Sequence, residues 1–411
     1  MSEADARSPT PKGFWVIWST VALDQIVFSM VLPVLPFVAR RYGASPIEVT
    51  ALVAVFALSQ FLISPLVGAL SDRFGRKPVL VISLFGSAIG SLILGVAGTL
   101  PLLFLGRAVD GLSGTALVSA QTAITDMVGP AKRARYLGLM GTAFAVGFIV
   151  GPMLSAFASQ VDARLPFFIA AGLGVLNALV AIVRLPETRP PEVRDALVSS
   201  RAAGSEDRSP FGFLRDTKAL NGATLFYIGV LATGLLAFSS VEGGAFTLLA
   251  DDRFGFDQTS IAWVFVWIGV VLAVVQVTLV APFNENLGIR RTLMAALAVN
   301  VVGFTLLAGA DLTLLMIIGI TANSVGQGLL RPTCTTAVSN SVAPQYRGRA
   351  IGTQTSAQGL VRIVGPLMAG LLYGGIGPGA PFAVAALITV ATAIAVASFG
   401  PRWDTALATG T

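Results

Sequence analysis

The sequence predicts an all-α integral membrane protein with twelve transmembrane helices in two pseudo-symmetric six-helix halves. Three observations support this prediction. Only 12% of the 411 residues are charged and 55% are hydrophobic, whereas about a quarter of the residues of a soluble protein are charged. Apolar runs long enough to cross a bilayer recur along the chain. The second half also repeats landmarks of the first half at a nearly constant offset.

The predicted spans are apolar runs that end at charged residues, glycine or proline. Their bounds are 14–38, 48–70, 78–98, 101–127, 136–158, 165–184, 222–249, 258–281, 291–310, 312–340, 350–375 and 380–399. The first run continues past Pro33 without a cleavage-like end, so it is predicted to be a span and not a signal peptide.

The polar segments divide the chain and orient it. Residues 1–13 and 400–411 are predicted to be cytoplasmic tails, 14–184 and 222–399 the two halves, and 185–221 a cytoplasmic linker rich in proline, serine and charge. Of the 27 Lys and Arg residues, twenty lie in the tails, the linker and the loops on the same side, and four lie in the opposite loops. Cytoplasmic loops are enriched in these cations. Both termini are therefore predicted to lie in the cytoplasm, with the spans in the inner (cytoplasmic) membrane.

The composition argues against several other classes of protein. The net charge is +6, but the cations lie in short loops, where they set topology, so no nucleic-acid partner is expected. The chain has no histidine and a single cysteine, Cys334, so no metal site, catalytic pair or intrachain disulfide is predicted. An enzyme is not expected, no cofactor is expected, and one chain is expected to suffice for function.

The second half resembles the first, which predicts an internal duplication. Val128–Gly138 (VGPAKRARYLG) resembles Val342–Gly352 (VAPQYRGRAIG), which begins 214 residues later, and the same offset relates Gly151 to Gly365. The polar loop Gly68–Leu80 (GALSDRFGRKPVL) has a weaker copy at an offset of 213 residues.

This loop, together with the six-plus-six layout, resembles the major facilitator superfamily. Gly147–Pro152 resembles the antiporter motif of proton-driven exporters, and Asp24 followed by Pro33–Pro36 resembles the first span of tetracycline and multidrug exporters. Tetracycline exporters carry an aspartate in the third span, where this chain has Gly90. The resemblance implies the major facilitator fold and export driven by a proton gradient.

Six ionisable residues lie well inside predicted spans: Asp24, Arg107, Asp110, Glu242, Arg331 and Arg362. A charge at membrane depth costs several kcal/mol unless it is paired or hydrated. Buried salt bridges between helices are one explanation, and a water-filled cavity is the other. Asp24 is predicted to be the principal proton-coupling acid, with Arg107 and Asp110 as a partner pair, because burial and nearby arginines change a carboxylate's proton affinity. Glu242, about 30 Å along its span, is predicted to lie near the outer face as a gate.

Polar residues at four-residue spacing mark two further spans: Asn323, Gln327 and Arg331, and then Gln354, Gln358 and Arg362. Each trio is predicted to form one stripe that faces a substrate cavity. Gln25 and Phe28 of the first span are predicted to line the same cavity. An approach of Asp24 to Arg362 is a further hypothesis. An apolar wall is predicted from aromatic residues, with ordinary helix packing as the alternative: Phe28, Phe144, Phe238, Phe246, Trp263 and Trp267.

Nine residues are predicted to act in conformational change: Gly68, Asp72, Arg73, Gly75, Arg76, Asp126, Gly147, Gly151 and Pro152. The resemblance implies that the loop touches span 11 and locks the outward-facing state. Asp72 would then face the positive N-terminus of that span, Gly68 would let the helices approach, and Arg76 would bridge to Asp126. The loop cations could instead serve only to set topology. Gly147, Gly151 and Pro152 form either a hinge or a close-packed helix contact.

The predicted function is proton-coupled export of small amphipathic compounds, drugs included, by alternating access. Its partners would be a small-molecule substrate, protons and the lipid bilayer. A carrier or importer of an anionic or zwitterionic metabolite is the alternative, suggested by the two arginines of the second half. An intramembrane enzyme or a transport-dead receptor is a remote alternative.

Overall fold

The computed structural model describes residues 13–114, 116–128, 130–188, 221–343 and 346–409. The described residues contain helices and no strands. The helices of the first half are α2 (Phe14–Val31), α3 (Leu35–Arg41), α4 (Pro46–Phe74), α5 (Arg76–Val96), α6 (Leu100–Ser113), α7 (Ala116–Met127), α8 (Pro130–Ser159) and α9 (Leu165–Arg184). Those of the second half are α11 (Gly222–Glu242), α12 (Ala245–Phe254), α13 (Gln258–Thr278), α14 (Val280–Ala308), α15 (Thr313–Asn340), α16 (Arg347–Gly375) and α17 (Ala380–Thr409).

Ten candidate spans in the described chain are long and apolar enough to cross a membrane. The fourth predicted span corresponds to α6 and α7 together, and the eleventh corresponds to the more polar α16. The predicted helical membrane fold is confirmed. Three predicted spans are interrupted within their predicted bounds: the first between α2 and α3, the fourth at Gly114, and the seventh at Gly243–Gly244. Gly244 has a φ of 96°, a value that glycine adopts without strain.

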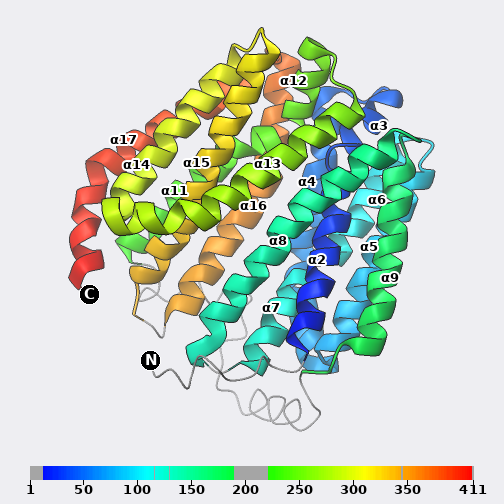
Figure 1. Ribbon diagram of the computed structural model, residues 1–411, viewed down its shortest axis with the longest axis horizontal. Helices are drawn as coiled ribbons and strands as arrows, with labels where there is room; N and C mark the ends of the chain where they lie inside the picture. Colours follow the sequence, from blue (N-terminus) through cyan, green and yellow to red (C-terminus); the bar gives the residue numbers. More distant parts are fainter. Residues whose placement is uncertain (1–12, 115, 129, 189–220, 344–345, 410–411) are drawn as a thin grey trace.

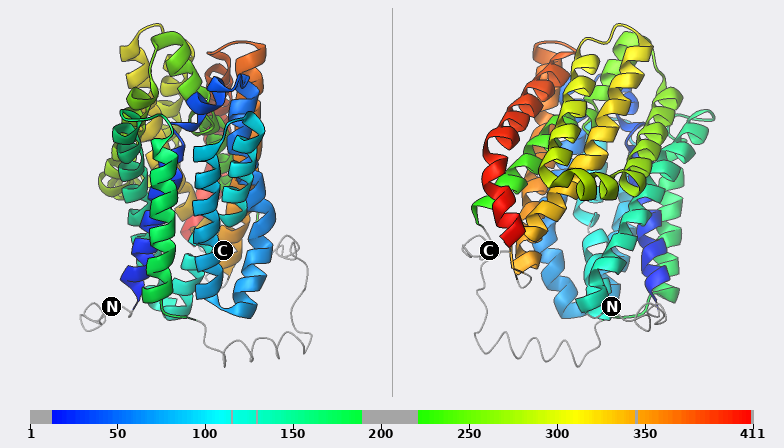
Figure 2. Two further views of the ribbon diagram at one scale, coloured as in Figure 1. Left: turned by 90° about the vertical axis from the view of Figure 1, so that its right-hand side faces the viewer. Right: turned by 60° about the vertical axis from the view of Figure 1, so that its left-hand side comes forward.

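The long helices run between two faces of the molecule (Figure 2). We call the face where α2 begins and α17 ends the terminal face, and the other face, which carries α3 and α12, the opposite face (Figure 1). In the view of Figure 1, α5, α6 and α9 lie on one side, α14, α15 and α17 on the other. Helices α4 and α8 of the first half pack against α16 and α13 of the second half. These two helix pairs form the boundary between the halves.

The antiparallel pair α4 and α16 is in contact at the opposite face and separated at the terminal face. A Cβ atom built on Gly370 would lie 2.9 Å from the Ile47 Cα. Further along the pair, a Cβ on Gly359 would lie 2.9 Å from the Phe61 ring. Beyond this point, Cβ atoms on Gly68 and Gly352 would meet nothing within 4 Å among the described residues. The two helices therefore diverge toward the terminal face.

The pair α8 and α13 diverges in the same direction. A Cβ on Gly269 would lie 2.6 Å from the Phe148 carbonyl oxygen, whereas Cβ atoms on Gly138 and Gly141, near the terminal face, would meet no described atom within 4 Å. Close to the opposite face, Gln258 donates hydrogen bonds of 2.9 Å across the boundary, to the Ser159 Oγ and to the Ala163 carbonyl. The structure is thus closed at the opposite face and open toward the terminal face.

A cluster of charged residues, which we call the outer latch, joins the halves at the opposite face. It consists of Arg40, Asp251, Asp252 and Tyr373. Arg40 of the first half donates hydrogen bonds to Asp251 at 2.7 Å and to both carboxylate oxygens of Asp252 at 2.6 and 2.8 Å. The Tyr373 hydroxyl donates to Asp252 at 2.5 Å. These bonds connect α3, α12 and α16.

Candidate functional site

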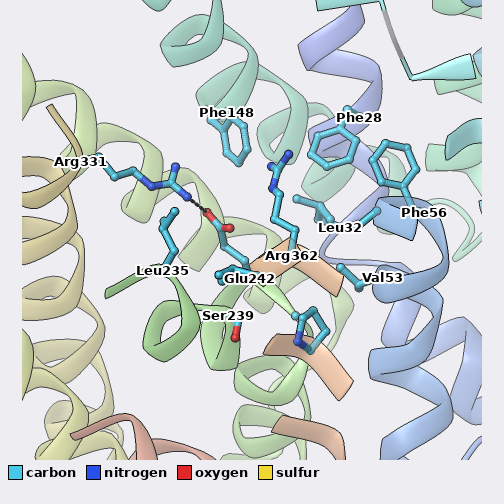
Figure 3. A pocket seen from close by; sticks show the side chains of 14 residues that line it. Phe28, Leu32, Val53, Phe56, Phe148, Leu235, Ser239, Glu242, Arg331 and Arg362 are labelled. Atoms are coloured by element: carbon cyan, nitrogen blue, oxygen red, sulfur yellow. Dashed lines mark ion pairs between the residues drawn. The ribbon is translucent and has the colours of Figure 1, made fainter. Parts of the chain in front are cut away.

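A pocket of about 600 Å³, part of it open to solvent, lies at the boundary between the halves (Figure 3). One wall is apolar and comes from the first half, with Phe28 and Leu32 on α2 and its C-terminal end, Val53 and Phe56 on α4, and Phe148 on α8. The Phe28 and Phe56 ring centroids are 5.1 Å apart, and those of Phe28 and Phe148 are 6.4 Å apart. Its apolar wall is typical of a site for a small molecule.

The other wall carries three charges from the second half: Glu242 at the end of α11, Arg331 on α15 and Arg362 on α16. The Arg331 and Glu242 side chains form an ion pair at 3.5 Å and remain partly exposed, at 40% and 28%. Arg362 is exposed to the pocket and has no ion pair or side-chain hydrogen bond within the described chain. Two cations therefore face one acid.

A second ionic cluster lies behind the apolar wall. Arg107 and Asp110 form an ion pair at 2.9 Å with side-chain exposures of 0% and 6%. The Arg107 Nε donates to the Leu52 carbonyl at 3.3 Å, and the Ser87 hydroxyl donates to Asp110 at 2.5 Å. Hydrogen bonds to the remaining polar atoms help a buried ion pair to be tolerated, although the buried Arg107 Nη2 has no hydrogen-bond partner among the described residues. The pair predicted from sequence is thus present, on α6.

Phe56 separates this buried pair from the pocket and touches both. The Arg107 guanidinium lies 4.3 Å from the Phe56 ring centre, which is within the range of a cation–π contact. Asp24 on α2 is partly exposed, accepts a hydrogen bond from the Gln25 side chain at 3.3 Å, and lies near enough to Asp110 for the two carboxyl groups to interact electrostatically. Asp24, Arg107 and Asp110 therefore form one electrostatic cluster, which we call the acid–arginine cluster.

Glycines of the predicted antiporter motif hold α8 tightly against α2. A Cβ on Gly147 would lie 2.4 Å from the Gln25 Cβ, and a Cβ on Gly151 would lie 2.6 Å from the Ile26 carbonyl oxygen. The Ser29 hydroxyl donates to the Gly147 carbonyl at 2.8 Å. Pro152 lies inside α8, which is continuous from Pro130 to Ser159. In this conformation the motif is a close-packed contact, one of the two roles predicted from its sequence.

Gly90 fills the same purpose between α5 and α6. A Cβ at this position would lie 2.7 Å from the Asp110 Cβ and 2.8 Å from its backbone nitrogen. The glycine thus lets the two helices approach at the level of the ion pair. An aspartate at this place would need the helices to move apart.

The polar loop after α4 is organised around Gly75, whose φ of 103° ends the helix. Asp72 pairs with Arg76 at 3.1 Å. Glu187, from the chain that follows α9, accepts hydrogen bonds from the backbone nitrogens of Arg76 and Lys77 at 3.0 and 3.2 Å. An acid at a helix N-terminus is stabilised by the helix dipole. Glu187 was not predicted, because it lies in a charged, proline-rich segment where no pattern distinguishes it from its neighbours.

The remaining predicted gating residues lie as follows. Gly68 is separated from α16 in this conformation, and the exposed Arg73 side chain lies 5.3 Å from the Phe74 ring centre. The Asp126 side chain lies outside the described part of the structure, so the predicted bridge to Arg76 is not described.

The polar stripes of the second half are only partly in the pocket. Arg331 and Arg362 line it, but four other members do not. Asn323 is fully buried against Gly303. Gln327 donates to the Gly234 carbonyl at 3.1 Å, and Gln354 donates to the Thr335 hydroxyl at 2.9 Å. Gln358 is partly buried on α16 and is not among the residues that line the pocket.

The other predicted cavity and coupling residues lie as follows. Glu242 faces Arg331 in the pocket and does not lie at an outer gate, because α11 ends there and the Arg331 side chain reaches across to it. Asp24 and Arg362 form no ion pair in the described structure, and Gln25 is buried against Gly147.

Phe28 lines the pocket as predicted, whereas Phe238 and Phe246 belong to the core and Trp263 and Trp267 are exposed. Phe56 and Phe148 line the pocket without having been predicted.

Comparison with known proteins shows which family the chain resembles in sequence. The sequence pattern of the Major Facilitator Superfamily matches residues 17–251 and 231–406. The tetracycline resistance protein, class G, of Vibrio anguillarum is 32% identical over 367 residues, which are 86% of this chain and 88% of that protein. Multidrug resistance protein 1 of Bacillus subtilis (strain 168) is 32% identical over 350 residues, 84% and 85% of the two chains.

A solved structure has the same fold. The human organic anion transporter MFSD10 superposes with a TM-score of 0.68 at 22% sequence identity, over 93% of this chain and 98% of that one. The family pattern spans both halves, and the described helices have the arrangement found in that transporter. The chain belongs to the Major Facilitator Superfamily.

Proposed function

We propose that the protein is a proton-coupled exporter of small amphipathic compounds that works by alternating access. The relatives named for resistance to tetracycline and to multiple drugs support this proposal. We place the protein in the cytoplasmic membrane with both termini in the cytoplasm, so that the terminal face is the cytoplasmic face. In that orientation the pocket of this structure is open to the cytoplasm, where an exporter takes up its substrate.

The observation that carries the proposal is the contact of Phe56 with both the pocket and Arg107. A compound that binds against the Phe56 ring presses on the side chain that covers the acid–arginine cluster. Helix α4, which carries Phe56, also accepts the Arg107 hydrogen bond at Leu52 and packs against α16 of the other half. Substrate binding, the charged cluster and the boundary between the halves are thus connected through one helix.

The acid–arginine cluster can hold and release a proton. Its two carboxyl groups lie near one arginine, so full ionisation leaves one negative charge in excess. Asp110 is bound by Arg107 and Ser87, whereas the partly exposed Asp24 accepts only the Gln25 bond within the described structure. Asp24 is therefore the group that exchanges a proton with water, while Arg107 and Asp110 hold its surroundings fixed. Rocking of the halves changes the hydration of Asp24 and hence its proton affinity.

The test is transport by the purified protein in liposomes with an imposed pH gradient, acidic inside. Uptake of a panel that includes tetracycline, ethidium and dansylglycine is measured with and without the gradient. Gradient-driven uptake of at least one compound is expected, and Asp24→Asn is expected to abolish it while leaving the protein folded and inserted. The matched control is Asp311→Asn, at an exposed acid in the α14–α15 loop, which is expected to transport normally. Full gradient-driven uptake by the Asp24 variant would contradict the proposed coupling.

A further inference from the structure

The pocket carries an uncompensated positive charge in this open conformation. Glu242 pairs with Arg331 at 3.5 Å and also attracts Arg362 electrostatically, but its single negative charge leaves one of the two arginines uncompensated. The Arg362 guanidinium is exposed to the pocket and makes no ion pair or hydrogen bond to the described residues. Water can solvate it here because the pocket is open toward the terminal face. A guanidinium offers five donors in a planar fork that matches a carboxylate.

Closure of the pocket removes that water. Alternating access requires a state in which the pocket is shut off from both faces, and an isolated charge in such a state is unstable unless it is paired. Glu242 cannot neutralise both arginines at once. The second anion must therefore come from a different part of the protein or from the substrate. Asp24 is the acid of the first half that was predicted to approach Arg362. It lies with Asp110 and is not paired with Arg362.

We propose that the substrate supplies this second anion: the protein exports aromatic compounds that carry a carboxylate or another anionic group, zwitterions included. The anionic group binds Arg362 and Arg331. The planar apolar body lies against Phe28, Phe56 and Phe148, and Figure 3 shows the Arg362 side chain extending toward Phe28 and Phe148. This inference rests on the proposed export function and names its substrate class.

Glu242 has a defined part in this inference. While the site is empty, its carboxylate is paired with the Arg331 guanidinium at the long distance of 3.5 Å. The Glu242 and Arg331 side chains are 28% and 40% exposed. Such a partly exposed pair is weak, so an incoming anion can displace it. Glu242 therefore competes with the substrate anion. For a cationic substrate the same residue would be the binding partner, so the two substrate classes predict opposite effects of removing its charge.

The experiment measures binding of three probes that share one fluorophore to the full-length protein in lipid nanodiscs. Dansylglycine carries a carboxylate, dansylglycinamide is neutral, and dansyl-ethylenediamine is cationic. We expect dansylglycine to bind roughly tenfold or more tightly than the amide, as for hydrogen bonds to a charged group. Arg362→Gln is expected to remove this preference, and Arg362→Lys to retain part of it.

The sign of the Glu242→Gln effect is the sharpest readout. This variant is expected to bind dansylglycine about two- to fivefold more tightly, the range of a partly exposed ion pair. Arg184→Gln, at an exposed arginine at the end of α9 and away from the pocket, is the matched control and is expected to bind all three probes like the unmodified protein. Thermal unfolding of each variant verifies that it is folded.

Preferential binding of dansyl-ethylenediamine, weakened by Glu242→Gln, would overturn the inference, and so would binding of the three probes that is equal or absent. The transport assay keeps this failure separate from a failure of the export proposal. If gradient-driven uptake of another compound depends on Asp24 while dansylglycine is not preferred, the export proposal stands and the substrate class is wrong. If dansylglycine binds through Arg362 but no gradient drives the uptake of any compound in the panel, the export proposal fails.

Discussion

Replacing Arg40 with alanine is expected to favour opening of the opposite face. Arg40 is the only member of the outer latch from the first half, and its three hydrogen bonds to Asp251 and Asp252 all cross the boundary. The substitution therefore removes the whole ionic connection between α3 and α12. The bond from Tyr373 to Asp252 remains, because both residues belong to the second half.

The size of the effect follows from the geometry and the exposure of the latch. Arg40 grips Asp252 with two parallel bonds, an arrangement that is stronger than a single contact. The side chains are 26% to 36% exposed, so solvent screens the pair. Because Arg40 binds Asp252 with two bonds, the contribution still lies near the upper end of the range for surface pairs. We expect about 1 to 2 kcal/mol. At about 1.4 kcal/mol per factor of ten, the ratio of open to closed molecules rises by a factor of roughly 5 to 30.

The assay is a distance measurement between spin labels across the opposite face. Suitable sites are Val161 and Leu312, which are 80% and 60% exposed and lie in loops of different halves. Both are changed to cysteine in a Cys334→Ser background. The fraction of molecules with the longer distance gives the population that is open at this face.

Arg253→Ala is the matched control. Arg253 lies on α12 beside the latch, but its hydrogen bonds go to the Ala308 and Ala310 carbonyls of the same half. If Arg40→Ala changes the open population less than twofold, or no more than Arg253→Ala does, the latch does not hold the halves together.

The latch should respond to acid only well below neutral pH. The hydrogen bonds from Arg40 lower the pKa of Asp252 below its ordinary value of 3.8, and the bond from Tyr373 acts in the same direction against the effect of burial. The stabilisation is therefore complete above that ordinary value and is lost as the pH falls through the lowered one. The population that is open at the opposite face should therefore stay constant between about pH 5 and 8. The measurement is made in an Asp24→Asn background, so that Asp24 does not titrate. A steep change within that range would show that another group, and not the latch, responds to the pH.

Three further outcomes are expected. Arg107→Gln leaves a buried acid without its partner and should destabilise the protein by about 3 to 5 kcal/mol, seen as a lower thermal unfolding temperature than that of an exposed-arginine variant. Gly151→Val should force α8 from α2 and lower both folded yield and transport, whereas normal transport would show that this contact is not needed. Cysteines at Gly68 and Gly352, with Cys334 replaced by serine, should form a disulfide only when the terminal face closes. A compound that holds the open state should therefore slow their oxidation. Oxidation that is equally fast with and without the compound would contradict closure along the antiparallel alignment of α4 and α16.

The helices and the ion pair of α6 could be predicted because their signals are local. Continuous apolar runs give the spans, and the three-residue spacing of Arg107 and Asp110 places both side chains on one helix face. The helix breaks at Gly114 and Gly243 lie inside predicted spans, where a glycine can equally serve close helix packing. Their positions depend on contacts with neighbouring helices.

The substrate wall was harder to predict for geometric reasons. Residues eight apart on a helix differ in direction by about 80°, so Asn323 faces α14 while Arg331 faces the pocket. Gln354 and Arg362 are separated in the same way. Phe56 has no feature that distinguishes it from other residues of an apolar span. Its role depends on α6 placing Arg107 beside its ring, and that contact joins parts of the chain fifty residues apart.

The contact between Gly359 and the Phe61 ring acts as the fulcrum of a lever. Thirteen residues of α4 extend from Phe61 to its end at Phe74, an arm of about 20 Å. An aperture of about 10 Å at the end of this arm needs a swing of only about 30°. A glycine against a flat ring offers no side chain that would obstruct such a swing at this point. The distance from this contact to the end of α4 then limits the size of a cargo that can pass the terminal face.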